Sequence, residues 1–193
     1  INFFLVNTNQ HYSKNMSKVF FDFFRIKYPK YNINANSSKE GDFFAKAVSG
    51  VERILYKEKP NFLIIQGDTN TALAGCFAAS VYNRKQDKKI NIVHVEDDLR
   101  SFDNNMPEEI NRILIDQMSN TLFVPTKFDL ENLKSEDITL DKKIFITGNT
   151  ISDIVKNYLP LIKKNNILEM FQIFKKEYFL LTLHRPESVD DVS

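Results

Sequence analysis

Residues 61–71 read NFLIIQGDTNT, and this stretch decides the fold class. The apolar run at 61–65 predicts a buried strand, and the Ala-rich segment at 68–82 predicts a helix directly after it. Gly67 permits the tight turn between the two elements. Asp68 and Thr69 are residue types that cap a helix, and the exposed N–H groups there can hold an anion or a hydroxyl group. A capped turn without any function explains the same residues. The stretch alone therefore predicts a strand followed by a helix, but it does not predict an activity.

The same alternation of apolar runs and helical patterns continues along the chain. We expect strands at 3–6, 61–65, 90–95, 121–124, 143–147 and 178–183, and helices at 14–24, 43–56, 68–82, 107–118, 127–133, 151–164 and 167–175. Residues 32–38 are polar and are expected to form a loop. This order predicts an α/β fold with a Rossmann-like parallel sheet that is covered by helices.

The chain of 193 residues is long enough for one such domain and part of another. We place the boundary near residue 150, with a first domain at 1–150 and connecting helices plus the start of a second domain at 151–193. The apolar run at the N-terminus and the early stop after 178–183 lead us to expect a fragment that lacks both ends. We also expect 177–193 to be its least well packed part.

Polar residues follow four of the predicted strands. They are Gly67-Asp68-Thr69, Glu96, Gly148-Asn149-Thr150 and His184-Arg185. Ligands of open parallel sheets bind beyond the carboxyl ends of the strands. These residues are therefore candidates for one binding site.

Each candidate also has a purely structural explanation. Glu96 begins a run of three acids, which suits a solvated turn or, with further ligands that we do not identify, a metal site. Glu108 and Glu109 lie in the first turn of a helix, where acids favour the helix dipole, although one could face a cleft. Arg112 is four residues after Glu108, so those two could form a surface ion pair. His184 could be catalytic or structural.

Composition excludes several classes of function. The net charge of +1 gives no electrostatic case for nucleic acid or an anionic membrane. No apolar stretch is long enough to span a membrane, and the N-terminus does not resemble a signal peptide. The single cysteine, Cys76, cannot form an internal disulfide, lies in an apolar run typical of a core, and fits a reducing cytoplasm. Motifs of serine hydrolases, P-loops, dinucleotide-binding loops and zinc sites do not occur.

Several blocks together resemble one family, the non-hydrolysing UDP-N-acetylglucosamine 2-epimerases. They are VNTNQHY at 6–12, NMSKVFF at 15–21, GDTNT at 67–71, HVE at 94–96, LRS at 99–101, MPEEINR at 106–112, TGNT at 147–150 and LHRPE at 183–187. The blocks occur in the order of the family and cover essentially the whole chain.

The resemblance implies the two-domain glycosyltransferase-B-type fold, with substrate between two Rossmann-like halves, of which this chain holds the first and a truncated second. It implies an isomerase that eliminates UDP from UDP-N-acetylglucosamine and re-adds it with the opposite configuration at C2, giving UDP-N-acetylmannosamine for surface polysaccharide synthesis. Proton transfers at C2 suit paired carboxylates with separated pKa values. No cofactor or metal is implied, and the complete enzyme is expected to be a cytoplasmic homodimer.

Position by position, the match assigns catalysis to Asp68, Glu96, Glu108 and His184. Substrate binding falls to Gly67, Thr69, Arg112 and Arg185. The chain departs from the family in lacking the opening GTRPE loop and the later SGG region, and in carrying Asp97-Asp98 in place of Ala-Gly. We therefore expect the 193-residue chain alone to be inactive. The alternatives are a 2-epimerase of a related UDP-diacetamido sugar, a weak nucleotide-sugar binder without catalysis, and a glycosyltransferase, which the carboxylates disfavour.

Overall fold

The computed structural model describes residues 1–10, 17–96, 100–139, 141–183 and 189 of the chain. In chain order the elements are β1 (Val6–Asn7), α1 (Lys18–Phe24), β2 (Tyr31–Asn32), α2 (Glu40–Glu58), β3 (Phe62–Gln66), α3 (Asn70–Arg84), β4 (Asn91–Val95), α4 (Pro107–Met118), β5 (Thr121–Val124), α5 (Lys127–Ser135), β6 (Lys143–Ile146), α6 (Thr150–Lys163) and α7 (Ile167–Met170). By contact density the chain separates into two compact units, Ile1–Thr150 and Ile151–Ser193.

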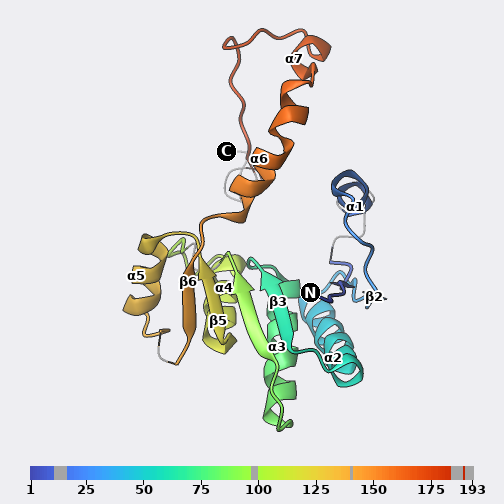
Figure 1. The fold of residues 1–193 in the computed structure, drawn as a ribbon, viewed down its shortest axis with the longest axis vertical. Helices are drawn as coiled ribbons and strands as arrows, with labels where there is room; N and C mark the ends of the chain where they lie inside the picture. Colours follow the sequence, from blue (N-terminus) through green and yellow to red (C-terminus); the bar gives the residue numbers. More distant parts are fainter. Residues whose placement is uncertain (11–16, 97–99, 140, 184–188, 190–193) are drawn as a thin grey trace. The chain divides into compact units, whose positions relative to one another are not determined.

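The first unit is built on a four-stranded sheet in the order β3-β4-β5-β6, with every neighbouring pair parallel. Figure 1 shows these strands side by side, with α5 next to β6 and α2 beyond β3. The register places Ile65 beside His94 and His94 beside Leu122. Because the strands run in one direction, their carboxyl ends lie along one edge of the sheet. The expected α/β class with a Rossmann-like parallel sheet is confirmed.

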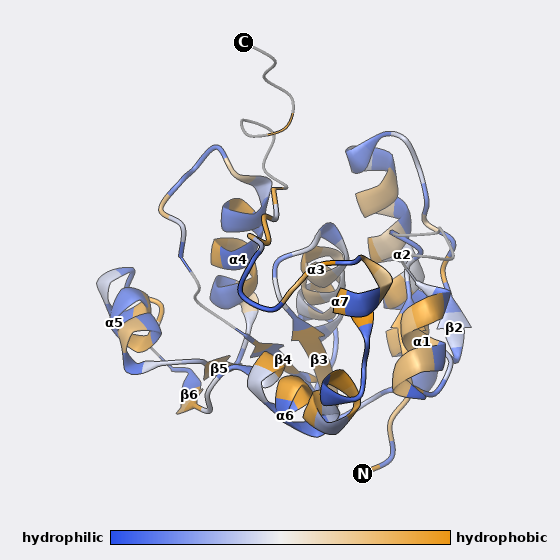
Figure 2. Ribbon diagram, turned by 90° about the horizontal axis from the view of Figure 1, so that it is seen from above, coloured by the Kyte–Doolittle hydropathy of each residue, from blue (hydrophilic) through white to orange (hydrophobic). Residues whose placement is uncertain are grey.

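Alternate residues of the strands form the core with the helices. Side chains of one sheet face, among them Ile65 and Ile92, pack against Leu55 of α2, Cys76 of α3 and Ile115 of α4. On the same face, Leu122 and Val124 pack with Leu133 of α5 in a second cluster. Figure 2 shows the apolar strands with α3 and α4 on one side of them. This packing fixes α4 beside the strand ends that carry the candidate site.

The opposite sheet face is more open. Phe62 and Ile64 of β3 are 59% and 68% exposed, and Phe145 of β6 is 48% exposed. Phe145 stacks on Phe123 of β5, with ring centroids 5.4 Å apart. The strands of this sheet therefore bury one face against helices and keep large apolar side chains accessible on the other.

The N-terminal part forms a separate two-stranded parallel sheet, in which Val6 of β1 pairs with Tyr31 of β2. The sequence predicts a strand at 3–6 and a loop from residue 32, and does not reveal β2. A two-residue strand has no apolar run to reveal it, because its pairing depends on the partner. The turn after β2 is held by Ile33 N, which donates to Asn7 O at 2.8 Å.

The expectation of a strand at 178–183 is wrong for the structure described. Residues 178–183 carry no strand and are exposed. A strand exists only where a neighbour accepts its hydrogen bonds, and an apolar run cannot supply that neighbour. The second unit contains α6 and α7, neither of which has a buried residue. Its assignment to a UDP-binding domain stays a prediction.

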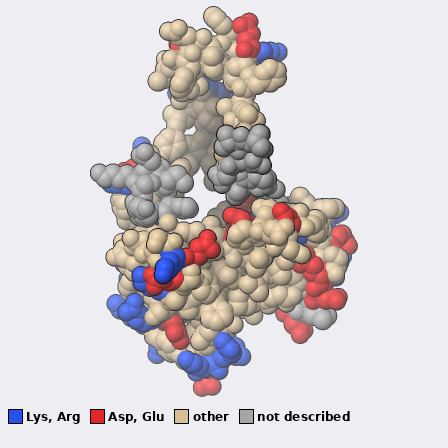
Figure 3. Space-filling model, turned by 180° about the vertical axis from the view of Figure 1, so that it is seen from behind, with Lys and Arg blue, Asp and Glu red and all other residues tan. Residues whose placement is uncertain are grey.

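On the face drawn in Figure 3, most of the described surface is neither acidic nor basic, with Lys and Arg mainly at the left and bottom and Asp and Glu mainly at the centre and right. In the part of the chain that the structure describes, every helix is too short or too polar to cross a membrane.

Candidate active site

The turn after β3 is held by its own backbone. Gly67 has a φ of 65°, a conformation that favours glycine. Its N–H donates to the carbonyl of Val95 at 3.2 Å, which ties the end of β3 to the end of β4. Thr69 is the N-cap of α3, and its hydroxyl accepts a hydrogen bond from the N–H of Ala72 at 3.2 Å. Asp68 is thereby presented at the carboxyl edge of the sheet.

Two residues of α4 hold Asp68. Arg112 Nη2 donates to Asp68 Oδ2 at 2.5 Å, and Asn111 Nδ2 donates to the Asp68 carbonyl oxygen at 2.8 Å. The Asp68 side chain remains 26% exposed, whereas that of Arg112 is 13% exposed. The carboxylate is thus fixed by a largely covered cation and still accessible to a ligand.

Glu96 lies at the end of the neighbouring strand, β4. Its φ of 62° turns the chain out of the sheet. Gln66 Nε2 donates to Glu96 Oε2 at 2.9 Å, and Asn149 Nδ2, which follows β6, donates to Oε1 at 3.4 Å. The expectation that polar residues of separate strand ends come together is met for Glu96 and Asn149.

The two acids of α4 have different surroundings. Glu109 is buried, and its carboxylate accepts hydrogen bonds from the N–H and hydroxyl of Ser101, both at 3.0 Å, and from the N–H of Phe102 at 3.2 Å. Arg112 Nη1 adds an ion pair at 2.7 Å. Burial acts to raise the pKa of Glu109, but these donors outweigh it and lower the pKa below the ordinary glutamate value.

Glu108 is exposed on the first turn of α4. The alternative of a surface ion pair between Glu108 and Arg112 is wrong, because Arg112 pairs with Asp68 and Glu109. The side chain of Glu109 points inward and accepts hydrogen bonds from the loop at Ser101 and Phe102. The side chain of Glu108 stays accessible to solvent. Whether Glu108 acts on a substrate stays a prediction.

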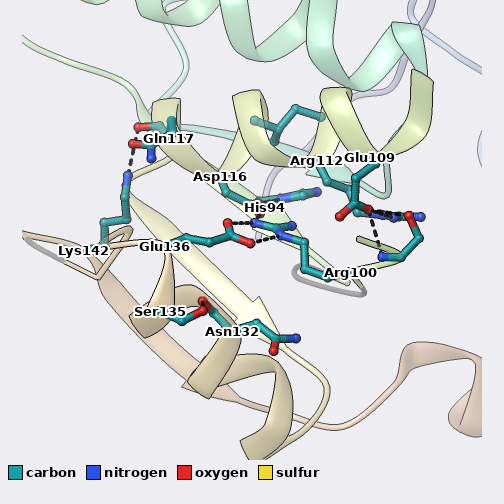
Figure 4. Close-up of polar contacts among 12 residues, drawn as sticks. His94, Arg100, Glu109, Arg112, Asp116, Gln117, Asn132, Ser135, Glu136 and Lys142 are labelled. Atoms are coloured by element: carbon teal, nitrogen blue, oxygen red, sulfur yellow. Dashed lines mark hydrogen bonds and ion pairs between the residues drawn. The ribbon is translucent and has the colours of Figure 1, made fainter. Parts of the chain in front are cut away.

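A buried polar network lies beside this site and was missed in the sequence. His94 and Asp116 are both fully buried, with Nδ1 and Oδ1 2.7 Å apart. Arg100 pairs with Asp116 Oδ2 at 2.7 Å and with both carboxylate oxygens of Glu136 at 2.8 Å. Figure 4 shows Arg100 between Glu136, which directly follows α5, and the His94–Asp116 pair. In the sequence, the only signal is His94 in a strand whose residues are mostly apolar.

The remaining candidates lie outside the described residues. They are His184, Arg185, Asp97 and Asp98. Among the residues that the structure does describe, no three His, Cys, Asp or Glu side chains are grouped so as to hold a metal ion. The described site therefore consists of two accessible carboxylates at adjacent strand ends, a cation shared by two acids, and a buried network behind them. Such carboxylates can accept and return protons.

Comparisons with known proteins show which family the chain belongs to. A family model described as UDP-N-acetylglucosamine 2-epimerase matches residues 1–193. The chain belongs to the UDP-N-acetylglucosamine 2-epimerase family. Its 2-epimerase relatives include a UDP-N-acetylglucosamine 2-epimerase of Methanococcus maripaludis, 48% identical over 98% of this chain and 50% of the relative. A second relative, UDP-2,3-diacetamido-2,3-dideoxy-D-glucuronate 2-epimerase of Pseudomonas aeruginosa, is 35% identical over 97% of this chain and 50% of its own length.

Solved structures of the 2-epimerase family share the fold. The crystal structure of the Methanocaldococcus jannaschii UDP-GlcNAc 2-epimerase, in complex with UDP-GlcNAc and UDP, matches with a TM-score of 0.86 and 46% identity. The match covers 99% of this chain and 51% of that enzyme. The chain thus spans about half the length of the 2-epimerases that it matches, and the resemblance to this family is confirmed.

Proposed function

We propose that this chain supplies one half of the active site of an enzyme that interconverts UDP-N-acetylglucosamine and UDP-N-acetylmannosamine. The observation that carries the proposal is the placement of Asp68 and Glu96 at the ends of two adjacent parallel strands, each held by a polar neighbour and each accessible. The solved relative with UDP-GlcNAc and UDP supports the substrate class. The complete enzyme is expected to act in the cytoplasm, as a homodimer, in making precursors of surface polysaccharides.

The proposed reaction removes the C2 proton and breaks the bond between C1 and the UDP oxygen. This gives UDP and 2-acetamidoglucal, with the electron pair of the C2–H bond forming the new double bond. In the return step UDP re-adds at C1 and a proton reaches the opposite face of C2. Asp68, Glu96, Glu108 and His184 are the proposed acids and bases, because two faces of C2 require groups on both sides.

The geometry refines the roles proposed for the cations and the turn. Both guanidinium contacts of Arg112 are to protein carboxylates, so we propose that Arg112 holds Asp68 and reaches the substrate only through it. Arg185 remains the candidate for the pyrophosphate. Gly67 and Thr69 would contribute backbone N–H groups at the start of α3, where an anion is favoured.

A graft tests the proposal. This chain replaces the matching half of the Methanocaldococcus jannaschii enzyme, and the purified graft is incubated with UDP-GlcNAc in deuterated water. We expect deuterium at C2 and formation of the mannose epimer, and loss of both in D68N and E96Q grafts. E131Q, a change at an exposed glutamate of α5, is the matched control and should keep activity.

The outcomes separate the alternatives. A folded graft that binds UDP-GlcNAc without exchanging the C2 proton would contradict the proposal and favour a binder without catalysis. A higher kcat/KM for the UDP-diacetamido sugar would favour the reaction named for the Pseudomonas relative. The 193-residue chain on its own is expected to show no exchange, since it spans about half of its relatives.

A further inference from the structure

The carbonyl group of Gly67 has a buried partner. His94 Nε2 lies 2.9 Å from the Gly67 carbonyl oxygen. A carbonyl oxygen can only accept a hydrogen bond, so Nε2 must carry the proton of this contact. The other ring nitrogen, Nδ1, lies 2.7 Å from Asp116 Oδ1. One further proton is therefore needed between His94 and Asp116.

Arg100 decides where that proton lies. Its Nη2 is 2.7 Å from the second oxygen of Asp116, and the side chains of both residues are fully buried. A cation at this distance favours the ionised carboxylate, so the proton belongs on Nδ1 and His94 is an imidazolium. Arg100 and His94 then balance Asp116 and Glu136 in charge, which a buried network requires.

The turn that His94 contacts depends on such hydrogen bonds. A Cβ at Gly67 would meet no atom within 4 Å, so side-chain packing offers no support at this position. The turn is tied instead through Gly67 N to Val95, through Gly67 O to His94, and through Asp68 O to Asn111. Of these anchors, only His94 connects the turn to the buried ionic network.

We propose that His94, held as a cation by Asp116, is a positioning residue that fixes the Gly67 carbonyl and thereby the place of the Asp68 carboxylate. The effect on catalysis rests on the proposed function, whereas the ring protonation and the hold on the turn do not. The competing explanation is that His94 serves only to neutralise Asp116 in the core. The two explanations differ in which ring nitrogen matters.

Two substitutions separate the two nitrogens. In His94→Asn the side-chain amide takes the place of Nδ1, so the contact with Asp116 is kept and the contact with Gly67 is lost. In His94→Gln the amide takes the place of Nε2, so the contact with Gly67 is kept and that with Asp116 is lost. For a positioning residue, H94N is the more harmful variant for the turn. For a residue that only neutralises Asp116, H94Q is the more harmful one.

The first measurement uses nitrogen NMR of the histidine rings in the 193-residue chain at neutral pH. The chain has three histidines, so the signal that disappears in H94Q identifies His94. We expect protons on both ring nitrogens of His94 in the unaltered protein and on one in Asp116→Asn, whose amide can donate to Nδ1. A single ring proton on His94 in the unaltered protein would overturn the proposal, and H94Q serves here only to assign the signal.

The second measurement follows the turn and then the reaction. Amide hydrogen exchange at Asp68 and Thr69 should quicken in H94N and stay nearly unchanged in H94Q. In the graft, H94N should lower kcat by on the order of tenfold to a hundredfold with KM unchanged, because a misplaced catalytic group loses rate. H94Q should lower kcat less. Equal effects of H94N and H94Q on amide exchange and kcat, or a larger effect of H94Q, would refute the positioning role. A graft that is inactive without any substitution would count against the proposed function alone.

Discussion

Arg112 Nη2 lies 2.5 Å from Asp68 Oδ2, while the other terminal nitrogen of the same guanidinium group, Nη1, pairs with Glu109. One cation therefore connects an accessible carboxylate to a buried one. The planar guanidinium group can do this because its donors point in two directions at fixed angles, which the single ammonium group of lysine cannot reproduce.

We predict that Arg112→Met lowers the free energy of unfolding by about 3 kcal/mol, because it leaves the buried Glu109 without its cation. Urea unfolding followed by circular dichroism measures this value. Arg53→Met, at an exposed arginine of α2, is the matched control and should change stability by less than about 0.5 kcal/mol. Equal losses in the two variants would show that the shared cation contributes nothing.

The two adjacent acids of α4 should differ in their effect on stability when replaced. Glu109→Gln should cost about 2 kcal/mol at neutral pH, because it removes the ion pair and weakens the contacts with Ser101 and Phe102. Since the pKa of Glu109 is lowered in the folded state, its stabilisation is complete above the ordinary glutamate pKa and is lost as pH falls through the folded value. The stability difference between the unaltered protein and E109Q should therefore narrow in acid.

Glu108→Gln is the companion to that experiment. Because Glu108 is exposed, E108Q should leave stability within about 0.5 kcal/mol at every pH. In the graft it should nevertheless reduce C2 proton exchange. A destabilised E108Q together with a neutral E109Q would mean that the two side chains have been assigned to the wrong sides of the helix.

Glu96 should show that its backbone favours glycine. At a φ of 62° a side chain with a Cβ is strained, so Glu96→Gly should be more stable than Glu96→Ala by about 1 kcal/mol. At Lys57, an exposed position within α2, alanine should instead be the more stable by about 1 kcal/mol. Thermal unfolding of the four variants measures both stability differences. If the alanine variant is the more stable at both positions, the backbone of Glu96 is not strained.

Cys76 should behave as a core residue. Burial raises the pKa of its thiol to about 12, which leaves almost no reactive thiolate at pH 8. Iodoacetamide should therefore leave the folded protein unlabelled and label it fully in urea. Labelling of the folded protein at the rate seen in urea would mean that α3 does not pack as described.

The strands of the main sheet could be predicted because each is a short apolar run between turn residues. The apolar run at 121–124 coincides with the observed strand, and Pro107 marks the first turn of the helix at 107–118. The missed strand β2 and the wrongly predicted strand at 178–183 have the same cause. Hydrogen bonding to a neighbour defines a strand, and neither the polar pair Tyr31–Asn32 nor an apolar run shows whether a neighbour is present.

Only part of the site could be predicted from the sequence. The placement of Asp68 and Glu96 after apolar runs was enough to bring them to one edge of the sheet. Helical periodicity could not decide between Glu108 and Glu109, because the choice depends on the loop at Ser101 that donates to Glu109. The role of Asp116 was also out of reach, because its buried partners His94 and Arg100 come from elsewhere in the chain.

The contacts between α4 and the turn at Gly67 also set an order of events during synthesis. Asn111 and Arg112 are 43 and 44 positions beyond Asp68, so neither anchor exists while the ribosome has released only β3 and α3. The nascent chain must first complete β4 and then deliver α4. The contacts of Asp68 with α4 can therefore form only after residue 112 has been synthesised, and a chain arrested before residue 112 carries Asp68 without the cation that holds it.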